Sequence, residues 1–120
     1  MTYKLFLDDE RVPVTDDWVV VRSYKDFVMT LTYKGTPYEV AFDHDLGTER
    51  TGLDCANFLV NQALNGLGFP SIVSVHSQNP VGRDAILGLI ENFKQKGDYY
   101  EIQPPSTVSV PLAEQFSSSC

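Results

Sequence analysis

The side chains that could do chemistry gather in three short segments, and each segment ends an apolar stretch. The stretches are "LFLDDER", "VAFDHD" and "VSVHSQN", and the third includes the second of the chain's two histidines. Their polar ends contribute Asp8, Asp9 and Arg11, then Asp43, His44 and Asp45, and finally His76, Ser77 and Asn79. Unpaired carboxylates are costly to bury. Their position at the mouths of apolar strands therefore predicts a cation or a proton at the same place.

Carboxylate oxygens are hard ligands, which predicts a divalent metal with Mg²⁺ or Mn²⁺ favoured. The candidate metal ligands are Asp8, Asp9, Asp43 and Asp45. Clustered carboxylates would otherwise repel one another and raise a pKa. With His44 or His76 as a further ligand, Mn²⁺ or Zn²⁺ would fit better. Either imidazole could instead be a general acid or base, and we expect catalytic roles for Asp9, Asp43 and His76 before the others.

The segment "HSQNPVGRD" adds groups of the opposite polarity. Asn79 fits a helix N-cap and Pro80 the first helical position, and the first turn of a helix presents unpaired N–H groups. Gly82 allows close approach of a ligand, and Arg11 and Arg83 supply fork-shaped donors. These residues predict a phosphate-binding set beside the carboxylates.

Two other chemistries stay open for the same residues. Ser77 could be a nucleophile with His76 as its base, although neighbours on an extended strand point to opposite faces and the pair would need a bend. Asp43 could be a nucleophile or a phosphoacceptor.

Alternating apolar strands and amphipathic helices must position these groups. Strands are predicted at residues 3–8, 18–22, 38–43 and 71–77, and residues 99–105 form a fifth strand or a final extended piece. Helices begin after Ser23, near Leu53 and at Pro80. This alternation predicts an α/β fold in which a mainly parallel five-stranded sheet lies between helices, a three-layer sandwich. Ligands of such sheets bind beyond the carboxyl ends of the strands, so we expect the three polar segments at one edge.

Length and composition limit the alternatives. The 120 residues predict one domain over residues 1–104, followed by a tail at 105–120 with an edge strand near Val108–Val110 and then disorder. A net charge of -7 argues against an extended nucleic-acid surface. No membrane span or signal-peptide pattern is evident, and Cys55 and Cys120 lack metal-ligand spacing. We expect a cytoplasmic protein.

The arrangement resembles a receiver domain of two-component signalling, which has a flavodoxin-like fold. By that resemblance, Asp8 and Asp9 match the metal-binding acidic pair, Asp43 the phosphorylated aspartate and Ser77 the hydroxyl residue after strand four. Two departures stand out. Gln103 occupies the position of the receiver's lysine, and "DDERVPVTDDW" leads straight into the second strand, so the first receiver helix is expected to be missing.

A closer resemblance is to cyclic-phosphate-processing receiver domains, whose pattern looks like "LDDxRxP", "DHDLG" and "HSxNPxG". This chain has "LDDERVP", "DHDLG" and "HSQNPVG", and the likeness spans roughly residues 3–95. The resemblance implies a role in bacteria or phages in RNA repair and in the handling of 2′,3′-cyclic phosphate ends.

The leading hypothesis is therefore a metal-dependent phosphoesterase acting on a cyclic phosphate of a nucleotide or an RNA end. A metal on Asp9 and Asp43 would bind water or a phosphate oxygen, a histidine would protonate the leaving group, and the phosphate-binding set would hold the non-bridging oxygens. Two alternatives remain: a degenerate receiver that acts as a protein-interaction module, and a nucleotide-binding sponge without catalysis.

Overall fold

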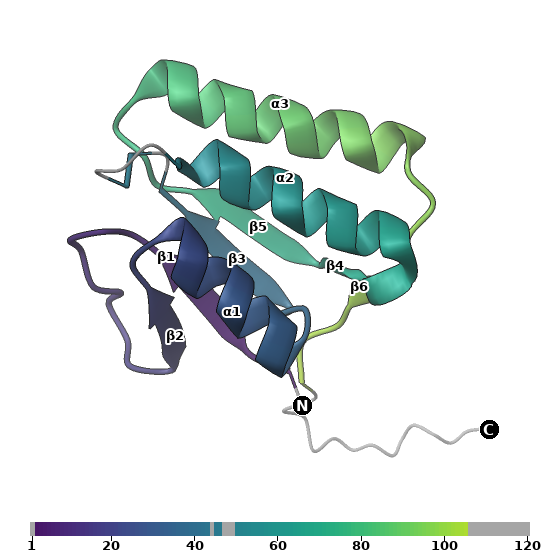
Figure 1. Ribbon diagram of the computed structural model, residues 1–120, viewed down its shortest axis with the longest axis horizontal. Coiled ribbons are helices and arrows are strands. Elements are labelled where there is room, and N and C mark those ends of the chain that lie inside the picture. The colour runs from purple at the N-terminus through teal and green to yellow at the C-terminus, as the bar shows by residue number, and fades with distance from the viewer. Residues whose placement is uncertain (1, 44, 47–49, 106–120) are drawn as a thin grey trace, which may run out of the picture.

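The computed structural model describes residues 2–43, 45–46 and 50–105 of the chain. Helices connect most of the successive strands, as Figure 1 shows. The elements are β1 (Lys4–Leu7), β2 (Trp18–Val21), α1 (Tyr24–Lys34), β3 (Glu39–Phe42), α2 (Gly52–Gln62), η1 (Ala63–Leu67), β4 (Phe69–Pro70), β5 (Ile72–Val75), α3 (Pro80–Lys96) and β6 (Glu101–Ile102). The edge strand predicted near Val108–Val110 and the residue His44 lie outside the described residues.

The central sheet is parallel throughout and has the strand order β2-β1-β3-β5. The α/β fold class is thus confirmed, but the expected five-stranded sheet has four strands in the described part of the chain. The strand predicted at 99–105 is reduced to β6, which pairs with β4 in a separate two-stranded sheet. Pro104 and Pro105 follow directly, and proline lacks the N–H that would continue the ladder.

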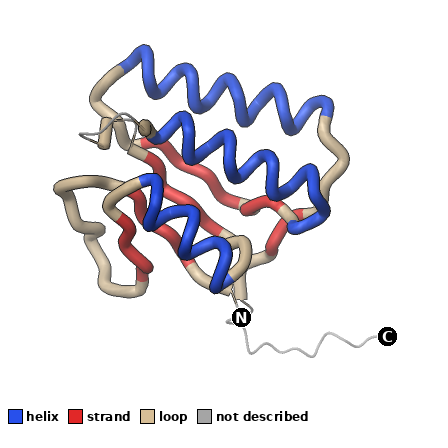
Figure 2. The backbone as a smooth tube through the Cα atoms, viewed as in Figure 1, coloured by secondary structure: helices blue, strands red, loops and turns tan. Residues whose placement is uncertain are grey.

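The described helices lie together on one face of the central sheet (Figure 2). Alternate strand residues, including Leu5, Leu7, Val40 and Phe42, point into this side and are fully buried with Phe27 of α1. Leu59 of α2 and Ile86 of α3 belong to the same core. The three-layer expectation is therefore wrong for the described residues, which form two layers, because no described helix covers the other face.

The connection between β1 and β2 contains no helix, as expected from the sequence. Asp8 instead bends the chain by accepting the N–H groups of Glu10 and Arg11. Arg22 then holds the loop through its Nη1, which donates to the carbonyl oxygens of Asp8 at 3.1 Å and Arg11 at 2.5 Å. This loop carries Asp8, Asp9 and Arg11, so these hydrogen bonds fix the position of the first polar segment.

Helix starts follow the predicted capping chemistry. The Ser23 hydroxyl accepts the N–H of Asp26, and the Asn79 side chain accepts the N–H of Gly82 with Pro80 at the first position of α3. The second helix begins at Gly52, one residue before the predicted start, because Thr51 and Asp54 form a reciprocal capping box.

Candidate functional site

The three polar segments meet at one edge of the central sheet, the edge formed by the carboxyl ends of its strands. Strand pairing continues just beyond the strands: the Asp43 N–H donates to the Leu7 carbonyl at 3.0 Å, and the His76 N–H donates to the Phe42 carbonyl at 2.9 Å. The parallel register therefore forces these residues to the same level. The convergence on which the functional hypotheses depend is present in the structure.

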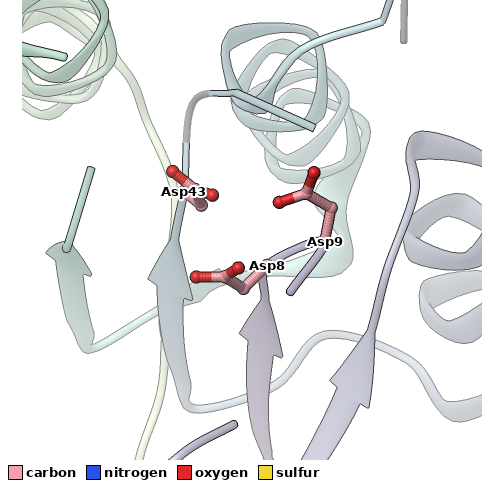
Figure 3. A group of neighbouring side chains, drawn as sticks. All are labelled: Asp8, Asp9 and Asp43. Atoms are coloured by element: carbon pink, nitrogen blue, oxygen red, sulfur yellow. The ribbon is translucent and has the colours of Figure 1, made fainter. Parts of the chain in front are cut away.

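Asp8, Asp9 and Asp43 form a carboxylate cluster at this edge, and Figure 3 shows their carboxylates gathered around one space. One oxygen of each lies within 4.8 Å of the others. Asp8 is 1 % exposed and Asp43 is 9 % exposed. The cluster concentrates negative charge in a partly desolvated place, where a cation would relieve the repulsion.

Asp8 is the most fully hydrogen-bonded member of the cluster. Its Oδ1 accepts the N–H groups of Glu10 and Arg11, both at 2.9 Å, and its Oδ2 lies 3.0 Å from Nε2 of His76. Burial raises the pKa of Asp8, but the backbone hydrogen bonds and the contact with His76 together lower it below the ordinary value. With its pKa lowered, the Asp8 carboxylate is charged at neutral pH. Its hydrogen bonds fix its orientation.

His76 is held from two sides. Its ring stacks on Phe6 with centroids 4.8 Å apart and an interplanar angle of 5°. The strands that carry these rings flank β3, so the rings meet over Ala41, which is 5 % exposed. Within the described part of the chain, the buried Nδ1 of His76 has no hydrogen-bond partner. His76 therefore positions Asp8 through Nε2.

Beside the cluster lies a hollow of about 310 Å³, which we call the acidic hollow. It is lined by Asp8, Asp9, Glu10, Arg11, Asp43, Asp45 and Gln78. The guanidinium of Arg11 is anchored by a 3.0 Å hydrogen bond from Nη1 to the His76 carbonyl, and its Nε lies 4.0 Å from Asp8 Oδ2. Arg11 thus brings a positive charge to the wall of an otherwise anionic site.

Glu10 and Gln78 were not predicted as site residues, although they stand within the polar segments that predicted the others. The same criterion, a polar side chain directly after a strand, would have included both. Asp45 lines the hollow, and its predicted role as a metal ligand stays a prediction. His44 lies outside the described residues.

The predicted phosphate-binding residues on α3 do not line the acidic hollow. Of the N–H groups in its first turn, Gly82 donates to Asn79 Oδ1 at 3.1 Å and Arg83 to the Asn79 carbonyl at 2.9 Å. Pro80 has no N–H to offer. The Arg83 side chain lies 3.9 Å from Asp84. Much of the donor capacity predicted for this turn is thus used by the helix itself.

Ser77 is buried, and its hydroxyl oxygen accepts the N–H of Asn79 at 3.1 Å. The hydroxyl proton is not used by that contact. The nucleophile hypothesis requires His76 as the base for Ser77. In this structure, Nε2 of His76 faces Asp8 instead.

The donor set fits a small divalent cation. Opposite oxygens around an octahedral Mg²⁺ are about 4.2 Å apart, twice the usual Mg–O distance, and the carboxylate oxygens here already lie within 4.8 Å. Asp8, Asp9 and Asp43 are therefore suited to hold one divalent cation.

Gln103, the residue aligned with the receiver's lysine, is placed far from this edge. β6 pairs Ile102 with Pro70, so Gln103 follows the register of Ser71. That level is five residues before His76, roughly 16 Å along a strand. The printed sequence has no lysine after Lys96, so no register of the final segment supplies one.

Comparisons with known proteins agree with this arrangement. Residues 3–92 match the family model described as cyclic-phosphate processing Receiver domain. Searches of curated proteins and of solved structures found no match. No helix among the described residues is long and apolar enough to span a membrane.

Proposed function

Because the chain belongs to the family of cyclic-phosphate processing receiver domains, we propose that it is a divalent-cation-dependent phosphoesterase that opens a cyclic phosphate on a nucleotide or at an RNA end. The observation that supports this proposal most is the grouping of three carboxylates within 4.8 Å of one another. Arg11 stands on the wall of the same hollow. A cation site and a phosphate-binding cation side chain are thereby adjacent.

Asp8, Asp9 and Asp43 would hold the cation. When bound, a divalent ion supplies Lewis acidity toward a phosphate oxygen and lowers the pKa of water. Asp8 is suited to a fixed ligand because its hydrogen bonds to two backbone N–H groups and to His76 restrict its rotation. Partners of this kind orient metal ligands in other proteins.

Arg11 would bind the non-bridging oxygens of the phosphate. The reaction forms one P–O bond from water and breaks one P–O bond to the ribose, which leaves a phosphate monoester. Water loses a proton and the ribose oxygen gains one. Asp45 and Glu10 also line the hollow, beside the three cluster members. Their carboxylates therefore lie near the water and the ribose oxygen that exchange these protons.

We assign His76 to positioning of Asp8 rather than to proton delivery. Its Nε2 faces Asp8, and its Nδ1 is buried. The earlier expectation that a histidine protonates the leaving group stays a prediction for His44.

The charge of the protein favours a small ligand. A net charge of -7 repels a long polyanion, whereas a mononucleotide or an exposed terminus brings few phosphates into the field. We therefore propose a nucleotide or an RNA terminus with a cyclic phosphate as the partner.

The proposal is tested by incubating the protein with 2′,3′-cyclic mononucleotides and Mg²⁺, Mn²⁺ or Zn²⁺, with products separated by chromatography. Monoester should form with Mg²⁺ or Mn²⁺ and vanish with EDTA. Asp43→Asn should reduce turnover by at least 100-fold, because it removes a charge from the cation site. Asp84→Asn is the matched control, since Asp84 is 76 % exposed on α3. No monoester with any metal would refute hydrolysis, and unchanged ligand recovered from a tight complex would favour a sponge.

A second candidate function is a phosphoaccepting or protein-docking receiver. The position of Asp43 directly after β3, beside Asp8 and Asp9, favours it. The absence of a lysine after Lys96 argues against ordinary switching. Treatment with a small phosphodonor and Mg²⁺, followed by intact-mass measurement, distinguishes the two: a labile phosphoryl adduct on Asp43 supports the receiver role.

A further inference from the structure

The face of the central sheet opposite the helices carries a second groove, distinct from the acidic hollow. Among the described residues, no helix packs on this face (Figure 1). Val20 and Ile72 pair in register with Phe6 and Glu39 of the same face, and they are 37 % and 42 % exposed. The groove measures about 370 Å³. We call it the aromatic groove; it is lined by Phe6, Arg11, Val12, Pro13, Val14, Trp18, Glu39, Ala41, Ser74 and His76.

Aromatic and apolar groups dominate the lining of the aromatic groove. Trp18 meets Phe6 edge-on with centroids 5.8 Å apart, and Phe6 in turn stacks on His76. The loop that closes one side exposes Val12 at 70 % and Val14 at 103 %. Exposed apolar side chains beside an aromatic floor are typical of a binding surface.

The aromatic groove adjoins the acidic hollow. Arg11 lines both, and His76 lines the groove while its Nε2 contacts Asp8 of the carboxylate cluster at 3.0 Å. A ligand that spans the two sites would therefore place an anionic group beside Arg11 and a flat apolar group beside Trp18. Phosphate and nucleobase are joined in that way within a nucleotide.

We propose that the aromatic groove binds the nucleobase of the nucleotide whose cyclic phosphate lies in the acidic hollow. This inference rests on the proposed function, since it takes the phosphate position from it. Trp18 is the stacking residue, because proteins bind unpaired bases on aromatic rings. The Lys4 ammonium lies over this ring, 4.4 Å from its centroid, so the base stacks on the part of the ring that lines the groove. The groove thus makes this protein selective for base-bearing cyclic phosphates over base-free ones.

Trp18 is also the reporter for the experiment, because it is the chain's single tryptophan. Its fluorescence is followed during titration with 2′,3′-cyclic AMP, with adenosine, and with the base-free methyl riboside 2′,3′-cyclic phosphate, all in Mg²⁺. Calorimetry gives the dissociation constants. The two base-bearing ligands should quench Trp18 saturably, and the base-free ligand should bind more weakly without quenching.

Variants separate stacking from folding. Trp18→Ala should weaken 2′,3′-cyclic AMP roughly tenfold to a hundredfold, the range found for base–aromatic stacking, and leave the base-free ligand within about twofold. Trp18→Phe should retain most of the affinity. Tyr33→Ala is the matched control, since Tyr33 is an 82 % exposed aromatic residue on α1. If Trp18→Ala does not fold, quenching of the wild type still decides the question.

The outcomes distinguish this inference from the proposed function. Base-dependent binding with unchanged ligand on chromatography supports the groove and refutes hydrolysis. Equal affinity and equal turnover for base-bearing and base-free ligands overturn the groove and leave hydrolysis standing. The groove is also overturned if Trp18→Ala weakens both ligands equally, or if Trp18 emission depends only on protein concentration, which indicates a second copy in the groove.

Discussion

Replacing Asp9 by Asn should stabilise the protein without metal and weaken its response to metal. Asp9 is the partly exposed member of the carboxylate cluster, whereas Asp8 is buried and Asp43 is nearly so. The substitution removes one negative charge and keeps the size of the side chain. It therefore tests whether the three carboxylates repel one another and whether they share a cation.

The magnitude follows from the spacing within the cluster. Two unit charges 4.8 Å apart repel by about 0.9 kcal/mol even in bulk water. Asp9 has two such neighbours; salt reduces the repulsion and partial burial increases it. We expect Asp9→Asn to raise the free energy of unfolding by about 1 to 2 kcal/mol. For a chain of this size, each kcal/mol corresponds to about 4 °C in Tm.

A bound cation should narrow or reverse this difference in stability. An ion at a hundred times its Kd stabilises the folded wild type by about 2.7 kcal/mol, and a variant with a weakened site gains less. Thermal unfolding is measured in EDTA and in a Mg²⁺ or Mn²⁺ series for both proteins. Asp9→Asn should have the higher Tm in EDTA and the smaller metal-dependent rise.

Asp16→Asn provides the control, because Asp16 is an exposed residue of the same loop and its loss changes the net charge equally. If Asp9→Asn gains no more stability in EDTA than this control, the carboxylates do not repel as their spacing requires. If the metal-dependent rise in Tm is the same in wild type and Asp9→Asn, Asp9 is not a ligand.

Three further predictions test contacts at the site and elsewhere in the fold. The pKa of Asp8 is lowered in the folded state, so this carboxylate stabilises the protein above its ordinary pKa of 3.8. The contribution is lost as the pH falls through the lower folded value. Asp8→Asn should therefore flatten the loss of stability at acid pH, measured by denaturant titrations at several pH values. Ala41→Leu should cost about 1–3 kcal/mol and disturb the His76 ring signals in NMR spectra, and unchanged signals would contradict the stacking over β3. Gly68→Ala should destabilise more than Gly35→Ala in chemical denaturation: both glycines have φ above +80°, but only at Gly68 would a Cβ meet side chains, at 2.8 Å; equal losses would show that β6 does not pack there.

Local features were largely predictable from the sequence. The strand 3–8 corresponds to β1, Ser23 and Asn79 cap their helices, and Pro80 begins α3. The gathering of Asp8, Asp43 and His76 was predictable as well, because parallel strands bring their carboxyl ends to one edge. What failed was the fifth strand of the central sheet, because the chain after residue 97 pairs as β6 with β4. The second helix layer failed as well, because the β1–β2 connection, whose right-handed crossover would lie on the other face, contains no helix.

The amino-acid sequence by itself determined the elements, their order and the edge at which the chemical residues meet. These depend on side-chain alternation, capping and chain direction, which neighbouring residues decide. The tertiary structure alone decided how the residues at that edge are used. Asp8 and His76 are 68 positions apart, and their pairing depends on the stack of His76 on Phe6 and on a small Ala41 beneath it. Contacts of this kind depend on packing between strands, so no pattern along the chain reveals them.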